Sequence, residues 1–176
     1  MAMAFSSLSA LLLLLLFPLV LFASFGAADE EKMTHLHFYL HEINSGANAT
    51  GMTVAVPPGK EFYYETFGAI SVIDDILREG PERDSKLIGR AQGLLAQASL
   101  EKPALLSAVN FVFTAGKYNG STFSILGRAV LTELFERAIV GGAGMFRMAR
   151  GYTLAKVISA EEGYLIMELD AYVVHP

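Results

Sequence analysis

Glu42 and the histidines just before it are the side chains whose types and spacing suggest chemistry first. Residues 34–43 alternate with a period of two, which indicates a half-buried strand with Leu36, Phe38, Leu40 and Glu42 on its apolar face. An inward carboxyl group must be hydrogen-bonded, paired or protonated, and we expect its pKa to be raised. Glu42 is therefore a candidate acid–base group in a ligand cavity. The alternative is a carboxylate at the rim that reaches solvent.

The motif His35-Leu-His37 on the other face of this strand imitates half of a divalent-metal site, in which a downstream glutamate completes the ligand set. Glu42 belongs to the opposite face, however, and His41 and His175 form no second motif. We therefore expect no metal site, and we interpret the histidines as solvent-facing or interface residues. The sequence also contains no nucleophile elbow, phosphate loop or cofactor fingerprint, so no cofactor is expected.

The elements that must position Glu42 are short strands between turns. Asp74 and Asp75 are interpreted as turn or cap residues before a charged loop over 75–86. Residues 132–138 are expected to form a short helix or a loop, and glycines 141, 142 and 144 a tight hairpin at a barrel corner. Further strands are expected at 52–56, 62–74, 87–99, 105–114, 121–131, 152–159 and 164–174. Eight or nine strands without an amphipathic helix predict an antiparallel β-barrel or sandwich.

The strand expected at 87–99 has one face made of Leu, Gly, Ala, Gly and Leu at alternate positions. Small side chains on the inner face of a barrel strand leave room for a ligand. The sequence therefore favours a barrel with an internal cavity.

Composition limits the class of protein further. Residues 1–28 are expected to be a secretory signal peptide, because their apolar run is too short to cross the ~30 Å core of a bilayer, and residues 29–176 form the mature domain. The net charge of −5 argues against a nucleic-acid partner, and the absence of cysteine means that the core alone must hold the fold. Two sequons, at Asn48 and Asn119, are expected to be glycosylated.

Five motifs follow one another in the order typical of a known family. They are His-Phe-Tyr-Leu-His-Glu-Ile at 37–43, Phe67-Gly68 with Asp74-Asp75, Ile-Gly-Arg-Ala-Gln-Gly at 88–93, Phe-Val-Phe-Thr at 111–114 with Gly-Lys-Tyr-Asn-Gly-Ser at 116–121, and Val-Gly-Gly-Ala-Gly-Met-Phe-Arg-Met-Ala-Arg-Gly-Tyr at 140–152. The mature chain resembles the plant dirigent proteins, of the disease-resistance-responsive type. The resemblance implies an eight-stranded antiparallel β-barrel of the allene-oxide-cyclase-like, calycin-like class. It also implies a glycoprotein secreted to the apoplast, without a membrane segment after signal cleavage, that forms a homodimer or homotrimer.

The resemblance also implies a function. Dirigent proteins bind phenoxy radicals, which a separate laccase or peroxidase makes from coniferyl alcohol, and direct their coupling to one stereoisomer of a lignan without a redox centre of their own. Some relatives are instead dehydratases that close an isoflavonoid ring through a quinone methide. A third alternative is a defence-related protein that binds a ligand without chemistry.

Only some of the pocket residues typical of the family are matched in this sequence. Glu42 stands where lignan-forming members have aspartate, and Asp74 is a further pocket candidate. The remaining positions differ in type from the family pattern: Leu95 and Gln97 replace tyrosine, Ala129 replaces aspartate, and Phe135, with Arg137 nearby, replaces an arginine. The scaffold matches the family and the polar pocket departs from it, so the substrate and the handedness of the product stay open.

Overall fold

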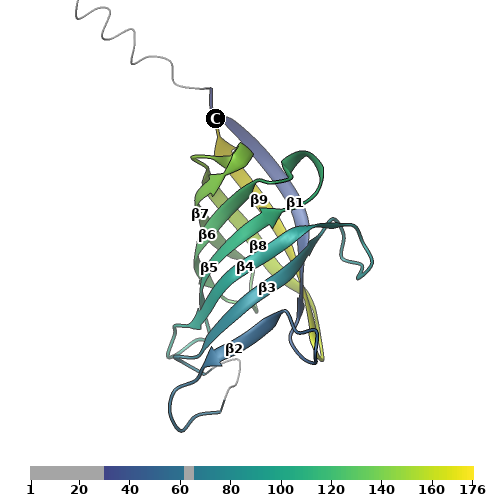
Figure 1. Ribbon diagram of the computed structural model, residues 1–176. Helices are drawn as coiled ribbons and strands as arrows, with labels where there is room; N and C mark the ends of the chain where they lie inside the picture. The colour runs from purple at the N-terminus through teal and green to yellow at the C-terminus, as the bar shows by residue number, and fades with distance from the viewer. Residues whose placement is uncertain (1–29, 62–65) are drawn as a thin grey trace, which may run out of the picture. The chain divides into compact units, whose positions relative to one another are not determined.

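The computed structural model describes residues 30–61 and 66–176, so the predicted signal peptide and part of the strand expected at 62–74 lie outside the described residues. The described chain is an antiparallel β-sheet protein (Figure 1). Its strands are β1 (Lys32–Ile43), β2 (Gly51–Ala55), β3 (Ile70–Arg78), β4 (Leu87–Gln97), β5 (Leu105–Phe113), β6 (Thr122–Ala129), β7 (Phe135–Ala143), β8 (Arg150–Glu161) and β9 (Tyr164–His175). Within the two described ranges, no helix is long and apolar enough to cross a membrane.

The sheet closes into a barrel because β1 pairs with β9 on one side and with β3 on the other. Along β3, His41 of β1 pairs with Ile76, and Gly51 of β2 then pairs with Ile73. Strands β1 and β2 thus occupy one position in the barrel, interrupted by the excursion of residues 44–50. The excursion is closed at its base by the Thr50 N–H, which donates to the Ile43 carbonyl at 2.7 Å. The predicted eight-stranded antiparallel barrel is confirmed.

One end of the barrel interior is filled with aromatic rings. Their centroids lie 5.0–6.0 Å apart, and they belong to Phe38, Phe111, Phe113, Phe123 and Phe146. Each ring is almost completely buried, and burial of a phenylalanine side chain stabilises a fold by roughly 1.5–3 kcal/mol. This packed end leaves the aliphatic half of the interior to form a cavity.

The segment after Asp74 is strand, not the expected charged loop. Strand β3 runs on to Arg78 because it is paired on both sides there, with β4 and with β1. Asp74 points out of the barrel and is exposed, whereas Asp75 points inward and is 1% exposed. The turn or cap role predicted for both residues was wrong.

The segment expected to be a short helix or a loop at 132–138 is also partly strand. Strand β7 begins at Phe135 and pairs with β8 from its first residue. The glycine-rich turn that follows contains the 3₁₀ turn Gly144–Phe146, which inserts the fully buried ring of Phe146 into the aromatic end of the barrel. This turn joins β7 to β8, but of the three glycines expected to form the hairpin only Gly144 lies in it, because residues 141 and 142 belong to β7.

The glycines of β4 were expected to leave room for a ligand inside the barrel, but they allow close packing of two neighbouring strands. A Cβ atom added to Gly89 would overlap the backbone carbonyl of Val112, and one added to Gly93 would overlap that of Ala108. The missing side chains therefore allow the backbone of β5 to approach β4, instead of leaving space for a ligand.

His41 lies on the outer face of β1, as the alternation predicted, yet it is completely buried. Its Nε2 lies 3.1 Å from the Gly80 carbonyl, which can only accept, so Nε2 donates and Nδ1 accepts from the Tyr164 hydroxyl at 2.8 Å. Burial lowers the pKa of His41. The prediction of a solvent-facing or interface histidine was wrong here, because the connection between β3 and β4 covers this part of the barrel wall.

Candidate functional site

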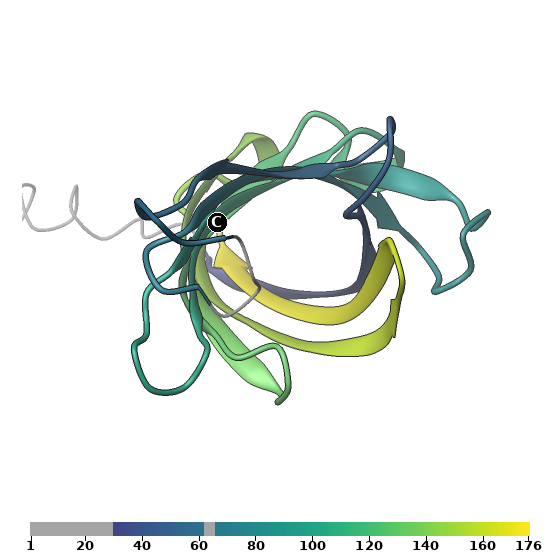
Figure 2. The ribbon, with the colours of Figure 1, turned by 90° about the horizontal axis from the view of Figure 1, so that it is seen from below.

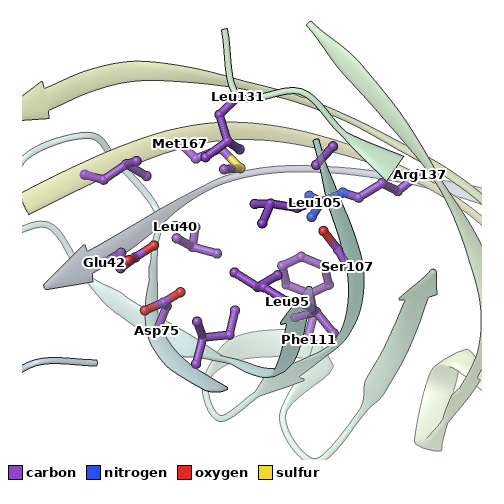
Figure 3. Close-up of a pocket in the computed structure, with 14 residues that line it drawn as sticks. Leu40, Glu42, Asp75, Leu95, Leu105, Ser107, Phe111, Leu131, Arg137 and Met167 are labelled. Atoms are coloured by element: carbon purple, nitrogen blue, oxygen red, sulfur yellow. The ribbon is translucent and has the colours of Figure 1, made fainter. Parts of the chain in front are cut away.

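A cavity enters the barrel at the end where β2 lies, which Figure 2 views end-on. Its outer part has a volume of about 300 Å³, within the range of small-molecule sites. An inner part continues toward the aromatic end and adds three polar side chains, those of Asp75, Ser107 and Arg137 (Figure 3). Six residues, mostly aliphatic, line both parts: Glu42, Ile73, Leu95, Leu105, Leu131 and Leu165.

Two carboxyl groups face the cavity from the point where β1 is interrupted. Glu42 is the last inward residue of β1, and Asp75 projects from the neighbouring strand β3 (Figure 3). Burial raises the pKa of Glu42. Burial, and next the charge of Glu42, raise the pKa of Asp75 to about 8. At neutral pH the Asp75 carboxyl group is therefore mostly protonated.

The orientation of Asp75 is fixed by the excursion that interrupts β1. The Thr50 hydroxyl donates to Oδ1 of Asp75 at 2.6 Å, and the same hydroxyl accepts from the Ile43 N–H at 2.9 Å. Oδ2 of Asp75 is buried and has no hydrogen-bond partner among the described residues. A protonated carboxyl group with one oxygen held and the other free is suited to donate a proton to a ligand.

Among the described residues, Arg137 is the one cation that faces the inner part of the cavity, from the wall opposite the carboxyl groups. Arg137 is 6% exposed, and its Nε and Nη2 have no hydrogen-bond partner among the described residues. Its guanidinium carbon lies 4.9 Å from the centroid of the Phe135 ring. Burial lowers the pKa of Arg137 to about 10, so it stays charged at neutral pH. The buried hydroxyl of Ser107 also lacks a partner within the described chain.

The residues expected to form the site divide into two groups. Those that line the cavity are Glu42, Leu95, Gln97, Ala129 and Arg137. Asp74 lies instead on the outer surface, where Nε of Arg90 donates to it at 2.8 Å and lowers its pKa. Phe135 is buried in the core and is not among the residues that line the cavity.

Asp75 and Ser107 line the cavity but were not predicted from the sequence. The inward direction of Asp75 could have been predicted, because Ile73, Asp75 and Leu77 share one face if the strand is continued past Asp74. The alternation of β5 places Ser107 on the inward face, but one serine among apolar residues does not by itself indicate a ligand-binding role.

The histidine motif and the sequons lie on the outside of the barrel. His35 Nε2 and His37 Nδ1 lie 2.7 and 3.0 Å from Oδ1 of Asp170, on the face opposite to that of Glu42. In the part of the chain that is described, no group of three or more histidine, cysteine, aspartate or glutamate side chains is arranged to hold a metal ion. Asn48 and Asn119 are both exposed, and their glycosylation stays a prediction.

Comparison with known proteins places this geometry in a family. A family model described as dirigent-like protein matches residues 33–174. The chain belongs to the dirigent family. Pterocarpan synthase 1 of Glycyrrhiza echinata is 45% identical over 151 residues, covering 84% of this chain and 80% of the relative. Dirigent protein 21 of Arabidopsis thaliana is 43% identical over 156 residues, covering 87% of this chain and 82% of the relative.

Solved structures agree with this assignment. The structure of a pterocarpan synthase dirigent protein superimposes with a TM-score of 0.78 at 44% identity, covering 85% of this chain and 88% of that one. A second pterocarpan synthase dirigent protein gives a TM-score of 0.77 at 45% identity, covering 84% and 97% of the two chains. The dirigent barrel is therefore shared at the level of both sequence and backbone.

Proposed function

We propose that this dirigent protein is a dehydratase that closes a ring in a phenolic isoflavonoid, through a quinone methide. The observation that carries the proposal is Asp75, a buried carboxyl group that holds a proton at neutral pH and lines an apolar cavity. Relatives named pterocarpan synthase support it at 45% and 43% identity.

The proposed reaction is balanced without an oxidant. Asp75 donates its proton to a benzylic hydroxyl of the substrate, the C–O bond breaks, and water leaves. A phenol conjugated with that carbon releases its own proton to solvent and supplies the electron pair, which gives the quinone methide. A second phenolic hydroxyl of the same molecule then attacks the methide carbon and returns a proton to Asp75, and the first phenolate takes a proton back from solvent. One C–O bond is broken, one is formed, and one water is lost.

The surroundings of Asp75 suit this chemistry. The leucine-rich walls of the cavity exclude water from a reactive methide, which would otherwise be trapped by solvent. They also hold the substrate so that one face of the methide carbon meets the nucleophile, and orientation alone supplies stereoselectivity. Glu42, beside Asp75, favours the protonated form of its neighbour and is a second acid–base group for the ring closure.

A second candidate is stereoselective coupling of phenoxy radicals to a lignan, with the radicals supplied by a separate laccase or peroxidase. The outer part of the cavity favours this second candidate. Its apolar side chains can contact the aromatic ring of one radical, and its volume of about 300 Å³ leaves room for a second radical to approach. In this case the protein acts by orientation, and about 1.4 kcal/mol of preference between two geometries gives a tenfold product ratio. Secretion to the apoplast and assembly into a homodimer or homotrimer accompany both candidates as proposals.

One pair of assays separates the candidates. The purified protein is incubated with an isoflavanol and no oxidant, and separately with coniferyl alcohol and a laccase, and both products are resolved by chiral chromatography. The dehydratase proposal predicts loss of water from the isoflavanol, accelerated relative to buffer and abolished in Glu42→Gln or Asp75→Asn. An enantiomeric excess of lignan without any isoflavanol turnover would favour the second candidate. Binding of either substrate without formation of a product would favour the third alternative, a protein that binds a ligand without chemistry.

A further inference from the structure

The inner cavity contains the buried positive charge of Arg137, which has no ion-pair partner among the described residues. Arg137 is 6% exposed, and two of its three guanidinium nitrogens have no hydrogen-bond partner among the described residues. None of the ion pairs found within the described ranges involves it. Burial of an unpaired charge is costly to a fold, and a ligand that pairs with Arg137 would offset that cost.

The register of the sheet directs this guanidinium toward Ser107. Ser107 on β5 pairs with Gly127 on β6. A Cβ atom at Gly127 would stand 3.3 Å from both Cα and Cγ of Arg137 on β7, so the stem of Arg137 occupies the space that the glycine leaves. On β8, the strand on the other side of β7, the Thr153 hydroxyl donates to the Arg137 carbonyl at 3.4 Å, so this donor is already used. The free donors are therefore those of Arg137 and Ser107, which point into the same part of the cavity in Figure 3.

We propose that Arg137 and Ser107 form a subsite for the phenolate oxygen of the ligand. Both side chains can donate to one oxygen, and a guanidinium favours an ionised partner over a neutral one. The walls beside them, Leu105 and Phe111, are apolar and suit an aromatic ring attached to that oxygen. Glu42 and Asp75 lie across the cavity from this subsite, so the ligand is polarised between an acid at one end and a cation at the other (Figure 3).

The inference deepens the proposed function and rests on it for the role of the bound oxygen. In the dehydration, the phenol conjugated with the benzylic carbon must supply an electron pair as the hydroxyl leaves. A phenol bound as phenolate supplies that pair more readily than a neutral one, and Arg137 stabilises this charged form without reorganisation of solvent. The substrate class is therefore a phenol with its leaving hydroxyl on the side of the ring away from the phenolate.

Binding of 4-nitrophenol tests the subsite without any turnover. Its phenolate absorbs visible light, so titration of the protein–probe complex gives both the affinity and the pKa of the bound phenol. We expect the wild type to lower that pKa. Arg137→Met should abolish the pKa shift and weaken binding of the ionised probe at least tenfold, while Ser107→Ala should weaken it several-fold. Binding of 4-nitroanisole, which cannot ionise, should change less than twofold in either variant.

Three results would overturn the inference. The first is that Arg137→Met binds 4-nitrophenolate as tightly as the wild type does. The second is that the variants lose affinity equally for 4-nitrophenol and 4-nitroanisole. The third is that benzoate binds more tightly than the phenolate and depends on Arg137 to the same extent. A structural role for Arg137 predicts a melting temperature below that of the wild type in Arg137→Met, whereas a ligand-binding role predicts no loss, because an unpaired buried charge is removed. Should Arg137→Met fail to fold, Ser107→Ala decides alone. Absence of isoflavanol turnover would count against the proposed reaction and leave this binding result standing.

Discussion

The Thr50 hydroxyl holds Oδ1 of Asp75 at 2.6 Å as a hydrogen-bond donor. Its direction is set by Ile43, whose N–H donates to the same hydroxyl oxygen and so turns the hydroxyl hydrogen toward Asp75. Because Oδ1 accepts this bond, the proton of Asp75 belongs on Oδ2, the oxygen without a partner among the described residues. The interruption between β1 and β2 thus determines which oxygen presents a transferable proton.

Removal of the Thr50 hydroxyl should raise the pKa of Asp75 further, because that hydrogen bond lowers it. In Thr50→Val we expect the titration of the Asp75 carboxyl carbon, followed by carbon-13 NMR, to move to higher pH than in the wild type. The free energy of unfolding should fall by about 1–3 kcal/mol, because the Ile43 N–H is left without its acceptor. Thr50→Ser keeps the hydroxyl and serves as the control. A Thr50→Val titration at or below the wild-type pH would contradict the assigned hydrogen bond.

Ionisation of Asp75 should make the fold less stable as pH rises. Its pKa is raised from 3.8 to about 8 in the folded state, so its contribution to stability is complete below about pH 4 and is lost as pH rises through about 8. Asparagine cannot ionise. We therefore expect the melting temperature of Asp75→Asn, relative to the wild type, to increase between pH 5 and pH 9. A difference that stays constant over this range would contradict the raised pKa of Asp75, because the folded and unfolded states would then bind the same number of protons.

The two kinds of glycine in the barrel should respond differently to alanine. Gly93→Ala places a methyl group against the Ala108 carbonyl and should lower the free energy of unfolding by ~3 kcal/mol. Gly141 has no atom within 4 Å of the added Cβ, so Gly141→Ala should change it by less than ~0.5 kcal/mol. Urea denaturation of both variants measures the difference. Comparable stability in the two would mean that the glycines of β4 are not required for the approach of β5.

The sequence predicted those features that depend on local pattern. Alternation in β1 gave the inward direction of Glu42, and turn residues separated most of the strands correctly. Eight or nine short strands between turns, with no amphipathic helix, were enough to predict an antiparallel barrel or sandwich, and the resemblance to the dirigent family selected the eight-stranded barrel.

Features that depend on pairing between distant segments were missed. Asp75 was assigned to a turn or loop because aspartate is common in turns. It lies within β3, where it pairs with Ala91 of β4, and the next residue, Ile76, pairs with His41 of β1. His41 was expected to be accessible, but it is buried against Gly80 and Tyr164, which are 39 and 123 positions away. The subsite at Arg137 likewise depends on Gly127 and Ser107, which lie on two other strands.

The most direct test of the account is single-turnover dehydration of an isoflavanol, without oxidant, by the wild type, Asp75→Asn and Asp74→Asn. The two aspartates are adjacent on β3, but Asp75 faces the cavity and Asp74 faces solvent, so the second variant controls for the same aspartate-to-asparagine change outside the cavity. We expect a rate at least about 100-fold lower in Asp75→Asn and within about twofold of the wild type in Asp74→Asn. An Asp75→Asn variant that retains the wild-type rate would contradict the role of Asp75 as the proton donor.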